Sequence, residues 1–249
     1  MTQTEPRPGV WRTVAIERIV EETPRVRSLS LAAPGWPGHL AGQHVDVRLT
    51  AEDGYQAQRS YSIASEPSGG LTLTIERIED GEVSSYLAGD AQTGDRFQVR
   101  GPIGGYFVWR PSPRPLLLVA GGSGVVPLMS MLRARRAYTN PGRAMLLYSS
   151  RSFEDIIYRE ELDAMAGQGD GLTVRHTLTR RQPAGWSGYA RRIDRGMLAD
   201  ATLKPSDKPE TFICGPTLLV DAAARLLVEL GHAAADIKTE RFGPSGGPA

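Results

Sequence analysis

The pattern of apolar residues changes near residue 112. Before that point, apolar and polar residues alternate in short segments such as Leu71–Glu76. This period of two is typical of antiparallel strands with one buried face. After that point, apolar residues come in nearly unbroken runs such as Leu116–Ala120, which is typical of parallel strands covered on both faces. The change predicts an all-β domain over residues 1–112 and an α/β domain over residues 113–249.

The first 112 residues contain at least five alternating segments, separated by turn residues such as Gly, Pro and Asp. Short strands at this spacing predict a sandwich or a small barrel, and closure into a barrel removes exposed sheet edges. We therefore predict an antiparallel Greek-key β-barrel. The alternating segments are Thr13–Glu17, Arg27–Leu31, Val45–Leu49, Leu71–Glu76 and Phe97–Arg100.

In the second half, helical stretches follow the apolar runs. Alternation of strand and helix predicts right-handed βαβ units and a doubly wound parallel sheet. Ligands of such sheets bind beyond the carboxyl ends of the strands. The apolar runs are Leu116–Ala120, Ala144–Tyr148 and Thr211–Cys214, and the predicted helices cover 127–138, 157–166 and 218–231.

Composition excludes several classes of protein. A net charge of +1 excludes strong electrostatic attraction to nucleic acid or to an anionic membrane. Because Cys214 is the single cysteine, the chain forms no internal disulfide and holds no Cys-ligated iron–sulfur cluster. Four dispersed histidines predict no metal site. The sequence shows neither a secretory signal nor an apolar run of about 20 residues, so we expect a cytoplasmic protein without a membrane span.

A glycine-rich turn is the clearest sign of a ligand. Gly121, Gly122, Ser123 and Gly124 follow an apolar strand and precede Pro127, which suits the first turn of a helix. Glycines allow close approach of a ligand, and a helix N-terminus attracts phosphate. The third glycine of the usual dinucleotide fingerprint is absent. The turn therefore indicates nucleotide binding, with a purely structural strand-to-helix turn as the alternative.

The segment Arg59-Ser60-Tyr61-Ser62 lies on an alternating strand. Alternation places Arg59 and Tyr61 on one face and Ser60 and Ser62 on the other. A guanidinium beside a phenol can clamp a phosphate and stack on a planar ring. Taken by itself, the segment also fits a solvated arginine and a half-buried tyrosine on an ordinary sheet.

Five short motifs occur in one order along residues 10–242, and together they resemble the ferredoxin–NADP⁺ reductase superfamily of flavoproteins. The resemblance implies an N-terminal flavin-binding barrel and a C-terminal NAD(P)-binding α/β domain, which agrees with the two apolar patterns. The motifs are Arg59–Ser62, Gly81–Leu87, Gly101–Gly105, Gly121–Pro127 and Cys214–Pro216.

For the barrel, the resemblance implies a set of flavin contacts. Arg59 would bind the phosphates, Tyr61 would stack on the isoalloxazine ring, and Ser62 would bond to flavin N5. Val83 and Ser84, at the start of a short helix, would bind a pyrophosphate, which favours FAD over FMN. The remaining barrel positions expected to bind the cofactor are Ser60 and Glu76.

For the second domain, the resemblance implies contacts with the nicotinamide nucleotide. Gly122, Ser123 and Gly124 would approach the nucleotide, and Cys214, followed by Gly215 and Pro216, would lie against the nicotinamide. Glu240 and Phe242 occupy the acid and aromatic positions near the C-terminus of some members, although seven residues follow Phe242 here. The expected catalytic positions are Ser62, Cys214 and Glu240.

The choice of coenzyme is expected to depend on Ser150 and Arg151, where the family places its adenosine-ribose discriminator. An arginine can pair with a 2′-phosphate, whereas NAD-specific sites usually offer an acid. We therefore expect NADPH to be favoured over NADH. Arg180, Arg181 and Tyr158 are possible assistants, and the acids Glu154 and Asp155 oppose the inference.

Together these features predict a flavin-dependent oxidoreductase. Hydride passes from NAD(P)H to FAD, and electrons leave to a separate acceptor such as a ferredoxin, an oxygenase or another redox enzyme. One alternative is a reductase of free flavin, quinone or another small acceptor. The other is a non-catalytic nucleotide-sensing subunit on the same fold, because a fold does not determine function.

Overall fold

The computed structural model describes residues 9–242. They form two compact units. The first contains the residues up to Arg110 together with Met129–Ala134, and the second contains Pro111–Leu128 and the residues from Arg135 onward. Apart from the helical segment Met129–Ala134, the first unit is all-β with one short helix, and the second is α/β, which confirms the predicted fold class.

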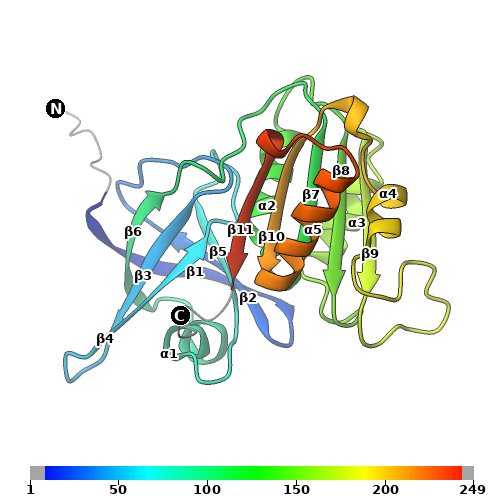
Figure 1. Cartoon of the computed structure of the whole chain (residues 1–249). Coiled ribbons are helices and arrows are strands. Elements are labelled where there is room, and N and C mark those ends of the chain that lie inside the picture. The colour runs from blue at the N-terminus through cyan, green and yellow to red at the C-terminus, as the bar shows by residue number, and fades with distance from the viewer. Residues whose placement is uncertain (1–8, 243–249) are drawn as a thin grey trace, which may run out of the picture. The chain divides into compact units, whose positions relative to one another are not determined.

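The first unit contains a six-stranded antiparallel sheet in the order β4-β3-β6-β1-β2-β5 (Figure 1). An isolated antiparallel bridge between Ile63, just after β4, and Leu73 of β5 connects the two ends of this order. The sheet therefore closes in the manner of a barrel. Its strands are β1 (Trp11–Thr23), β2 (Val26–Ala32), β3 (His44–Thr50), β4 (Gln56–Ser62), β5 (Leu71–Glu76) and β6 (Arg96–Ile103).

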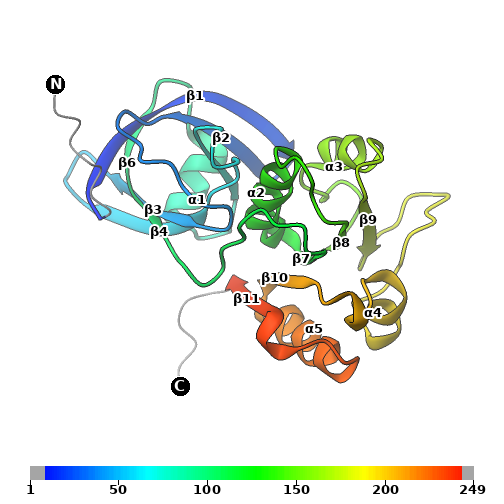
Figure 2. The ribbon, with the colours of Figure 1, turned by 90° about the horizontal axis from the view of Figure 1, so that it is seen from above.

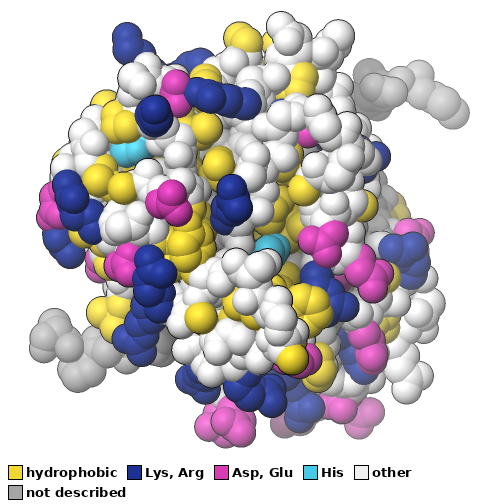
Figure 3. Space-filling model, turned by 90° about the vertical axis from the view of Figure 1, so that its right-hand side faces the viewer, with side chains coloured by type: hydrophobic (Ala, Val, Ile, Leu, Met, Phe, Trp, Pro, Cys, Tyr) yellow, Lys and Arg dark blue, Asp and Glu magenta, His cyan; other side chains and the backbone are white. Residues whose placement is uncertain are grey.

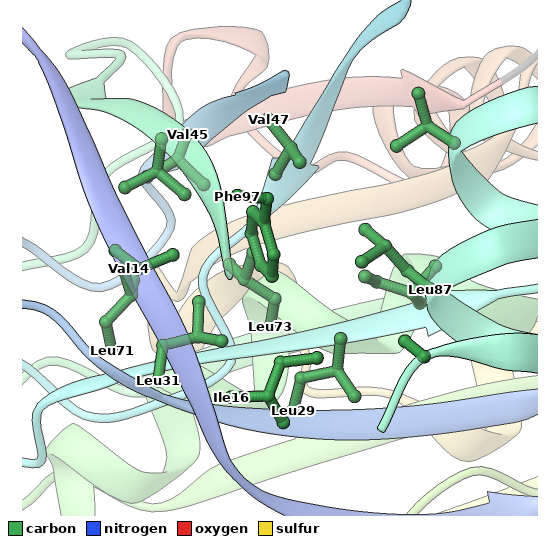
Figure 4. Close-up of a cluster of buried hydrophobic side chains, with 14 of the residues drawn as sticks. Val14, Ile16, Leu29, Leu31, Val45, Val47, Leu71, Leu73, Leu87 and Phe97 are labelled. Atoms are coloured by element: carbon green, nitrogen blue, oxygen red, sulfur yellow. The ribbon is translucent and has the colours of Figure 1, made fainter. Parts of the chain in front are cut away.

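The alternating residues of these strands form the core of the first unit. Val14, Leu29, Val47 and Phe97 come from four different strands and are almost completely buried in one cluster (Figure 4). Burying an aliphatic or aromatic side chain of this size contributes about 2 kcal/mol. The period of two is therefore the direct cause of the closed sheet, because it directs one apolar face inward.

A short helix follows β5 and packs against this core. Helix α1 (Glu82–Ser85) continues into one π-helical turn, η1 (Tyr86–Asp90). Val83 and Leu87, four residues apart, are both buried in the barrel cluster. Residues at this spacing lie on one helix face, so the contact fixes the orientation of α1 on the barrel.

The second unit is built on a five-stranded, fully parallel sheet in the order β11-β10-β7-β8-β9 (Figure 1). The chain runs from β7 to β8 and β9 on one side and then returns to β10 and β11 on the other side of β7. The order therefore reverses between β7 and β10. The strands are β7 (Leu116–Gly121), β8 (Ala144–Ser150), β9 (Leu172–Leu178), β10 (Glu210–Pro216) and β11 (Ile237–Phe242).

Helices cover both faces of this sheet, α2 and α3 on one face and α4 and α5 on the other (Figure 2). Leu117 and Val119 of β7 pack with residues of α4 and α5, and the alternate residue Leu118 is equally buried. This explains the unbroken apolar runs. The helices are α2 (Val125–Arg136), α3 (Arg159–Ala166), α4 (Arg195–Ala201) and α5 (Thr217–Glu229), with 3-10 turns η2 (Gly122–Gly124), η3 (Pro205–Asp207) and η4 (Ala234–Asp236). None of the helices in the described part of the chain has the length and apolar character that a membrane crossing requires.

Candidate functional site

Strand β4 presents the first group of expected cofactor residues. In its pairing with β3, Tyr61 lies opposite Val45 and Ser62 lies opposite His44. The Tyr61 ring packs against the barrel core, and burial raises the pKa of its hydroxyl well above the usual value. Arg59 is exposed, and its guanidinium donates a hydrogen bond of 2.7 Å to the carbonyl of the preceding residue. The strand therefore offers a half-buried aromatic ring beside a solvent-accessible cation.

Ser62 ends β4 with a buried side chain. Its Oγ has no hydrogen-bond partner among the described residues of the protein. A buried polar atom that lacks a partner is costly, and a ligand atom can remove that cost. The imidazole of His44, on the opposite strand, has its pKa lowered by burial, while the Asp46 carboxylate acts in the other direction.

Ser60 lies on the same face as Ser62 but is already engaged. Its hydroxyl donates a hydrogen bond of 2.6 Å to Asp46 on β3, which also forms an ion pair of 2.6 Å with Arg100 on β6. The pKa of the Asp46 carboxyl is lowered overall, because these bonds outweigh its burial. The Ser60 side chain thus belongs to a polar network that joins three strands.

The short helix of the first unit presents backbone rather than side chains. The side chain of Val83 is in the core, and the Ser84 hydroxyl donates to Gly81 O and accepts from Ile78 N, both at 3.3 Å. The first-turn N–H groups of a helix have no partner within it, so they are the groups that α1 offers to an anion. Glu76, the last residue of β5, precedes the loop to this helix.

In the second unit, the expected nucleotide residues come from four strands that end at the same edge of the sheet. The strand order reverses between β7 and β10, and crevices at such points are where doubly wound sheets bind ligands. Gly122 follows β7 with φ of +53°, and a Cβ built there would meet none of the described atoms within 4 Å. The turn can therefore approach a ligand closely at Gly122.

Gly124, in the same turn, has a different role. A Cβ at this position would lie 2.6 Å from the amide nitrogen of Gly215 and closer still to the Cys214 carbonyl. The turn after β7 thus packs directly against the backbone at the end of β10. Ser123 lies between these two glycines in η2.

Cys214 on β10 and Glu240 on β11 are paired in the parallel register. Burial raises the pKa of the Cys214 thiol, and the nearby Glu240 carboxylate raises it further, so the thiol stays protonated. Burial also raises the pKa of Glu240 to about 7. The Oε2 atom of Glu240 is buried and has no hydrogen-bond partner within residues 9–242. Near neutral pH, the Glu240 carboxylate can therefore take up or release a proton, whereas the Cys214 thiol keeps its proton.

The ends of β10 and β11 also bring Pro216 and Phe242 into register. Pro216 is exposed and precedes helix α5, while Phe242 is half-buried. Gly215, which precedes Pro216 in β10, has φ of +150°, a conformation that disfavours a side chain. The seven residues that follow Phe242 lie outside the described residues.

The end of β8 brings three arginines together. The Arg151 carbonyl accepts hydrogen bonds from the N–H groups of Arg180 and Arg181, at 2.8 and 3.1 Å, and all three side chains are exposed. Arg181 pairs loosely with Glu154 at 3.8 Å. The Ser150 Oγ, just before Arg151, is buried and lacks a partner among the described residues. This corner of the sheet therefore carries three exposed arginines and the acids Glu154 and Asp155 next to an unused hydroxyl.

Two further residues named for the coenzyme site, Asp155 and Tyr158, lie in the loop that follows Arg151. Tyr158 is 3% exposed and precedes α3 in a left-handed conformation, so its side chain does not share the surface of Arg151. Asp155 accepts a hydrogen bond of 2.8 Å from Ser152 within its own loop.

Charged side chains elsewhere are dispersed. On the face drawn in Figure 3, Lys and Arg side chains lie among Asp and Glu side chains. The densest basic cluster in the sequence, Arg191, Arg192 and Arg195, is exposed, and Arg191 bonds to Asp194 at 2.6 Å. Within residues 9–242, no group of three or more His, Cys, Asp or Glu side chains is arranged to hold a metal ion.

Two residues beside these sites were not predicted from the sequence. His44 lies opposite Ser62 only because β3 pairs with β4, and no spacing in the chain indicates this. The hydroxyl of Tyr148 contacts both the turn after β7 and the loop after β8. The sequence pattern indicates only that Tyr148 belongs to an apolar strand.

The two units match two families of domain. Residues 14–108 match the oxidoreductase FAD-binding domain, and residues 118–225 match the oxidoreductase NAD-binding domain. The chain is 36% identical over 253 residues to ferredoxin–NADP reductase B of Sorangium cellulosum, and the alignment covers 97% of this chain and all of that protein. The chain belongs to the ferredoxin–NADP⁺ reductase superfamily.

Other members of the superfamily show the same relationship. The glycine betaine monooxygenase reductase subunit of Pseudomonas aeruginosa is 32% identical over 92% of this chain, which spans 63% of that subunit. The fold is that of a ferredoxin NADP⁺ reductase from Neisseria gonorrhoeae, with a TM-score of 0.79, 21% identity and coverage of 93% of this chain and 98% of that one. The predicted superfamily, the flavoprotein oxidoreductase class and the cofactors FAD and NAD(P)H are confirmed.

Proposed function

We propose that this reductase takes hydride from NADPH onto FAD and passes the electrons to a separate iron–sulfur protein or oxygenase component. The observation that carries the proposal is the full-length match to a ferredoxin–NADP reductase, with the FAD-binding and NAD-binding models side by side in one chain. The proposal assigns FAD to the first unit and the coenzyme to the second.

The residues of the first unit fit FAD. Arg59 supplies an exposed cation for the phosphates, and the half-buried ring of Tyr61 supplies a surface for stacking. The buried hydroxyl of Ser62 gains the hydrogen-bond partner that it lacks among the described residues. The start of α1 supplies N–H groups for a pyrophosphate, which favours a dinucleotide flavin.

The residues of the second unit fit a nicotinamide dinucleotide. The turn at Gly122 leaves open space where a side chain would stand, next to the start of a helix. The buried Ser150 hydroxyl lacks a partner within the described chain and lies at the end of the neighbouring strand. The proposal therefore places the coenzyme across the ends of β7 and β8, with its nicotinamide toward Cys214 at the end of β10.

When bound, the two cofactors supply hydride transfer from nicotinamide C4 to flavin N5 and one-electron release from the flavin. The protein contributes by binding and orienting both reactants, because this lowers the entropic cost of bringing them into contact. In this role Ser62 holds a hydrogen bond at the flavin, and Cys214 offers a neutral surface to the nicotinamide. Glu240, whose pKa is raised to about 7 by burial, can hold a proton beside Cys214.

The three arginines at the end of β8 support NADPH over NADH. A 2′-phosphate carries close to two negative charges. Exposed arginines, of which one is loosely paired with an acid, therefore bind a 2′-phosphate better than they bind an uncharged ribose hydroxyl. The buried hydroxyl of Ser150 lies next to Arg151 and can bond to the same group.

The names of the relatives support a protein acceptor. One is a ferredoxin–NADP reductase and another is the reductase subunit of a monooxygenase. In this chain, the single cysteine is buried, so the flavin is the redox centre that the proposal uses.

Anaerobic titration with NADPH tests the proposal. We expect the isolated protein to carry FAD and to lose its visible flavin absorbance on addition of one equivalent of NADPH. A reduced sample should then reoxidise when an oxidised plant-type [2Fe–2S] ferredoxin is added. A flavin that stays oxidised in NADPH and in NADH would contradict the proposed activity, and reoxidation by quinone but not by the ferredoxin would contradict the proposed acceptor.

A further inference from the structure

The buried hydroxyl of Tyr148 connects two loops at the edge of the parallel sheet. Tyr148 lies in the middle of β8, opposite Ala120 of β7, and its side chain is completely buried. Its Oη donates a hydrogen bond of 3.1 Å to the carbonyl of Gly122 and accepts one of 3.3 Å from the N–H of Ile157. One atom therefore holds the glycine-rich turn after β7 and the loop that leads from β8 to α3.

The bond to Gly122 acts on a turn with an unusual conformation. Gly122 has φ of +53°, and its carbonyl also accepts the N–H of Val125 at the start of α2. A carbonyl held by two donors is fixed in direction. The hydroxyl of Tyr148 therefore holds the turn at Gly122, while the packing of Gly124 against the end of β10 holds it from the other strand.

The bond to Ile157 acts on the loop that carries the arginine corner. Residues 151–158 include Arg151 and end at Tyr158, where α3 begins. Within this loop, the backbone bonds from Asp155 to Ser152 and from Ile156 to Phe153 are long, at 3.3 Å each. The bond from Ile157 to Tyr148 has the same length, so it acts together with the buried side chains of Ile156 and Ile157 and with the shorter bonds at the Arg151 carbonyl in holding the loop.

The hydroxyl at this position adds two hydrogen bonds to what the ring contributes by packing. A phenylalanine would fill the same space, and burying a hydroxyl carries a cost that only its hydrogen bonds offset. The ring also packs against His176 of β9, with centroids 5.7 Å apart, so its own position is fixed from the other side.

We propose that Tyr148 is a positioning residue for the coenzyme: its hydroxyl sets the distance between the turn at Gly122 and the loop at Arg151, both of which a bound NAD(P) must reach. This inference rests on the proposed function. Because Tyr148 is buried beneath the loops and acts on their backbone, its effect is the same for NADPH and NADH. That separates it from Arg151, which acts on one coenzyme.

The test compares Tyr148→Phe with Tyr189→Phe in the intact flavoprotein. The Tyr189 hydroxyl donates its hydrogen bond to Asp200 of α4 and not to either loop of the described chain, so it controls for the loss of a bonded phenol. For Tyr148→Phe we expect the Kd of NADP⁺ and the KM of both NADPH and NADH to rise about fivefold, with kcat within twofold of the unaltered protein. FAD content should stay unchanged in both variants.

Four outcomes would overturn the inference: an unchanged Kd in Tyr148→Phe, an equal rise in Tyr189→Phe, an effect on one coenzyme alone, or a loss of FAD. A substitution that lowered thermal stability without moving Kd or KM would assign Tyr148 to packing. If the unaltered protein failed to bind NADP⁺ or NAD⁺, the proposed function itself would be overturned, and this inference with it.

Discussion

Cys214 and Glu240 lie opposite one another in the parallel pairing of β10 with β11. The pair combines a thiol kept neutral by burial with a carboxylate whose pKa is raised to about 7. Burial disfavours the charged form of both groups, so it moves both pKa values upward. Of these two groups, Glu240 is therefore the one that exchanges a proton near neutral pH.

The first prediction concerns the pH dependence of stability. The folded protein holds the Glu240 proton up to about pH 7, whereas the unfolded chain releases it near pH 4.5, so rising pH across this interval destabilises the folded state. Glu240→Gln removes this effect. We expect the Tm of the variant, relative to the unaltered protein, to rise by about 6 °C between pH 5 and pH 8.

Differential scanning calorimetry between pH 5 and pH 8 measures this difference directly. The histidines titrate in both proteins, so they cancel in the comparison. Glu160→Gln, at an exposed position of α3, is the matched control and should show a constant difference. If the Tm difference between Glu240→Gln and the unaltered protein does not grow with pH, the pKa of Glu240 is not raised in the folded protein.

The second prediction concerns the unpartnered hydroxyl of Ser62. Ser62→Ala removes a buried polar atom that lacks a partner in the described protein, so the flavin-free protein should be no less stable. The stabilisation gained on adding FAD should become smaller, and flavin reduction by NADPH should slow about tenfold.

Thermal shift with and without FAD, together with stopped-flow reduction, tests both parts. Ser62→Thr keeps a hydroxyl and should recover most of the rate, while Ser68→Ala, in an exposed loop, should change neither quantity. A drop in the stability of flavin-free Ser62→Ala would mean that the hydroxyl already has a role in the protein.

The third prediction concerns coenzyme choice at Arg151. Removing one of three clustered cations weakens binding of a 2′-phosphate but not of a ribose hydroxyl. We expect Arg151→Ala to lower kcat/KM for NADPH at least tenfold and to leave kcat/KM for NADH within twofold.

Steady-state kinetics with both coenzymes at two ionic strengths provide the measurement. The value of kcat/KM for NADPH should also depend less on salt concentration in the variant, because salt screens the attraction between the arginine and the phosphate. Arg18→Ala, at an exposed position of β1 in the first unit, is the control for the general loss of a cation. Equal losses for NADPH and NADH would reject a discriminating role for Arg151.

The fourth prediction concerns the close packing at Gly124. Gly124→Ala forces the turn after β7 away from the end of β10, because the new methyl group would overlap the backbone at Cys214 and Gly215. We expect a loss of about 3 kcal/mol in unfolding free energy and weaker NADP⁺ binding. Gly196→Ala, in helix α4, meets Asp194 Oδ1 at an ordinary 3.5 Å and should be neutral or stabilising. Equal stability of the two variants in urea would show that the turn has room to move.

Local sequence patterns predicted most of the fold, because burial on one or both faces leaves a direct trace in the sequence. Helix α5 was expected at 218–231 and is observed at Thr217–Glu229. Strands β9 and β11 and helix α4 were not predicted. Strand β9 lies at a sheet edge, where exposed residues such as Thr173 and Arg175 interrupt the apolar run. Strand β11 is the other edge, and α4 is only seven residues long.

The site was predictable only where a short motif carries its chemistry. Arg59, Tyr61 and Gly122 stand in such motifs, and their neighbours in sequence are also their neighbours in space. Ser84 shows the limit of this reasoning, because its hydroxyl is bonded within the loop before α1. Tyr148 shows it more clearly, since its hydroxyl bonds to residues 26 positions before it and 9 after it, and the role proposed for it rests on these contacts.

The order of strands in the parallel sheet has a consequence for how such enzymes diversify. The arginine corner follows β8, whereas Cys214 closes β10, on the opposite side of β7. In the proposed site, replacements after β8 alter which coenzyme is accepted and leave the segment around Cys214 unchanged. In this architecture, coenzyme preference and hydride transfer therefore depend on different segments of the chain, which can evolve at different rates.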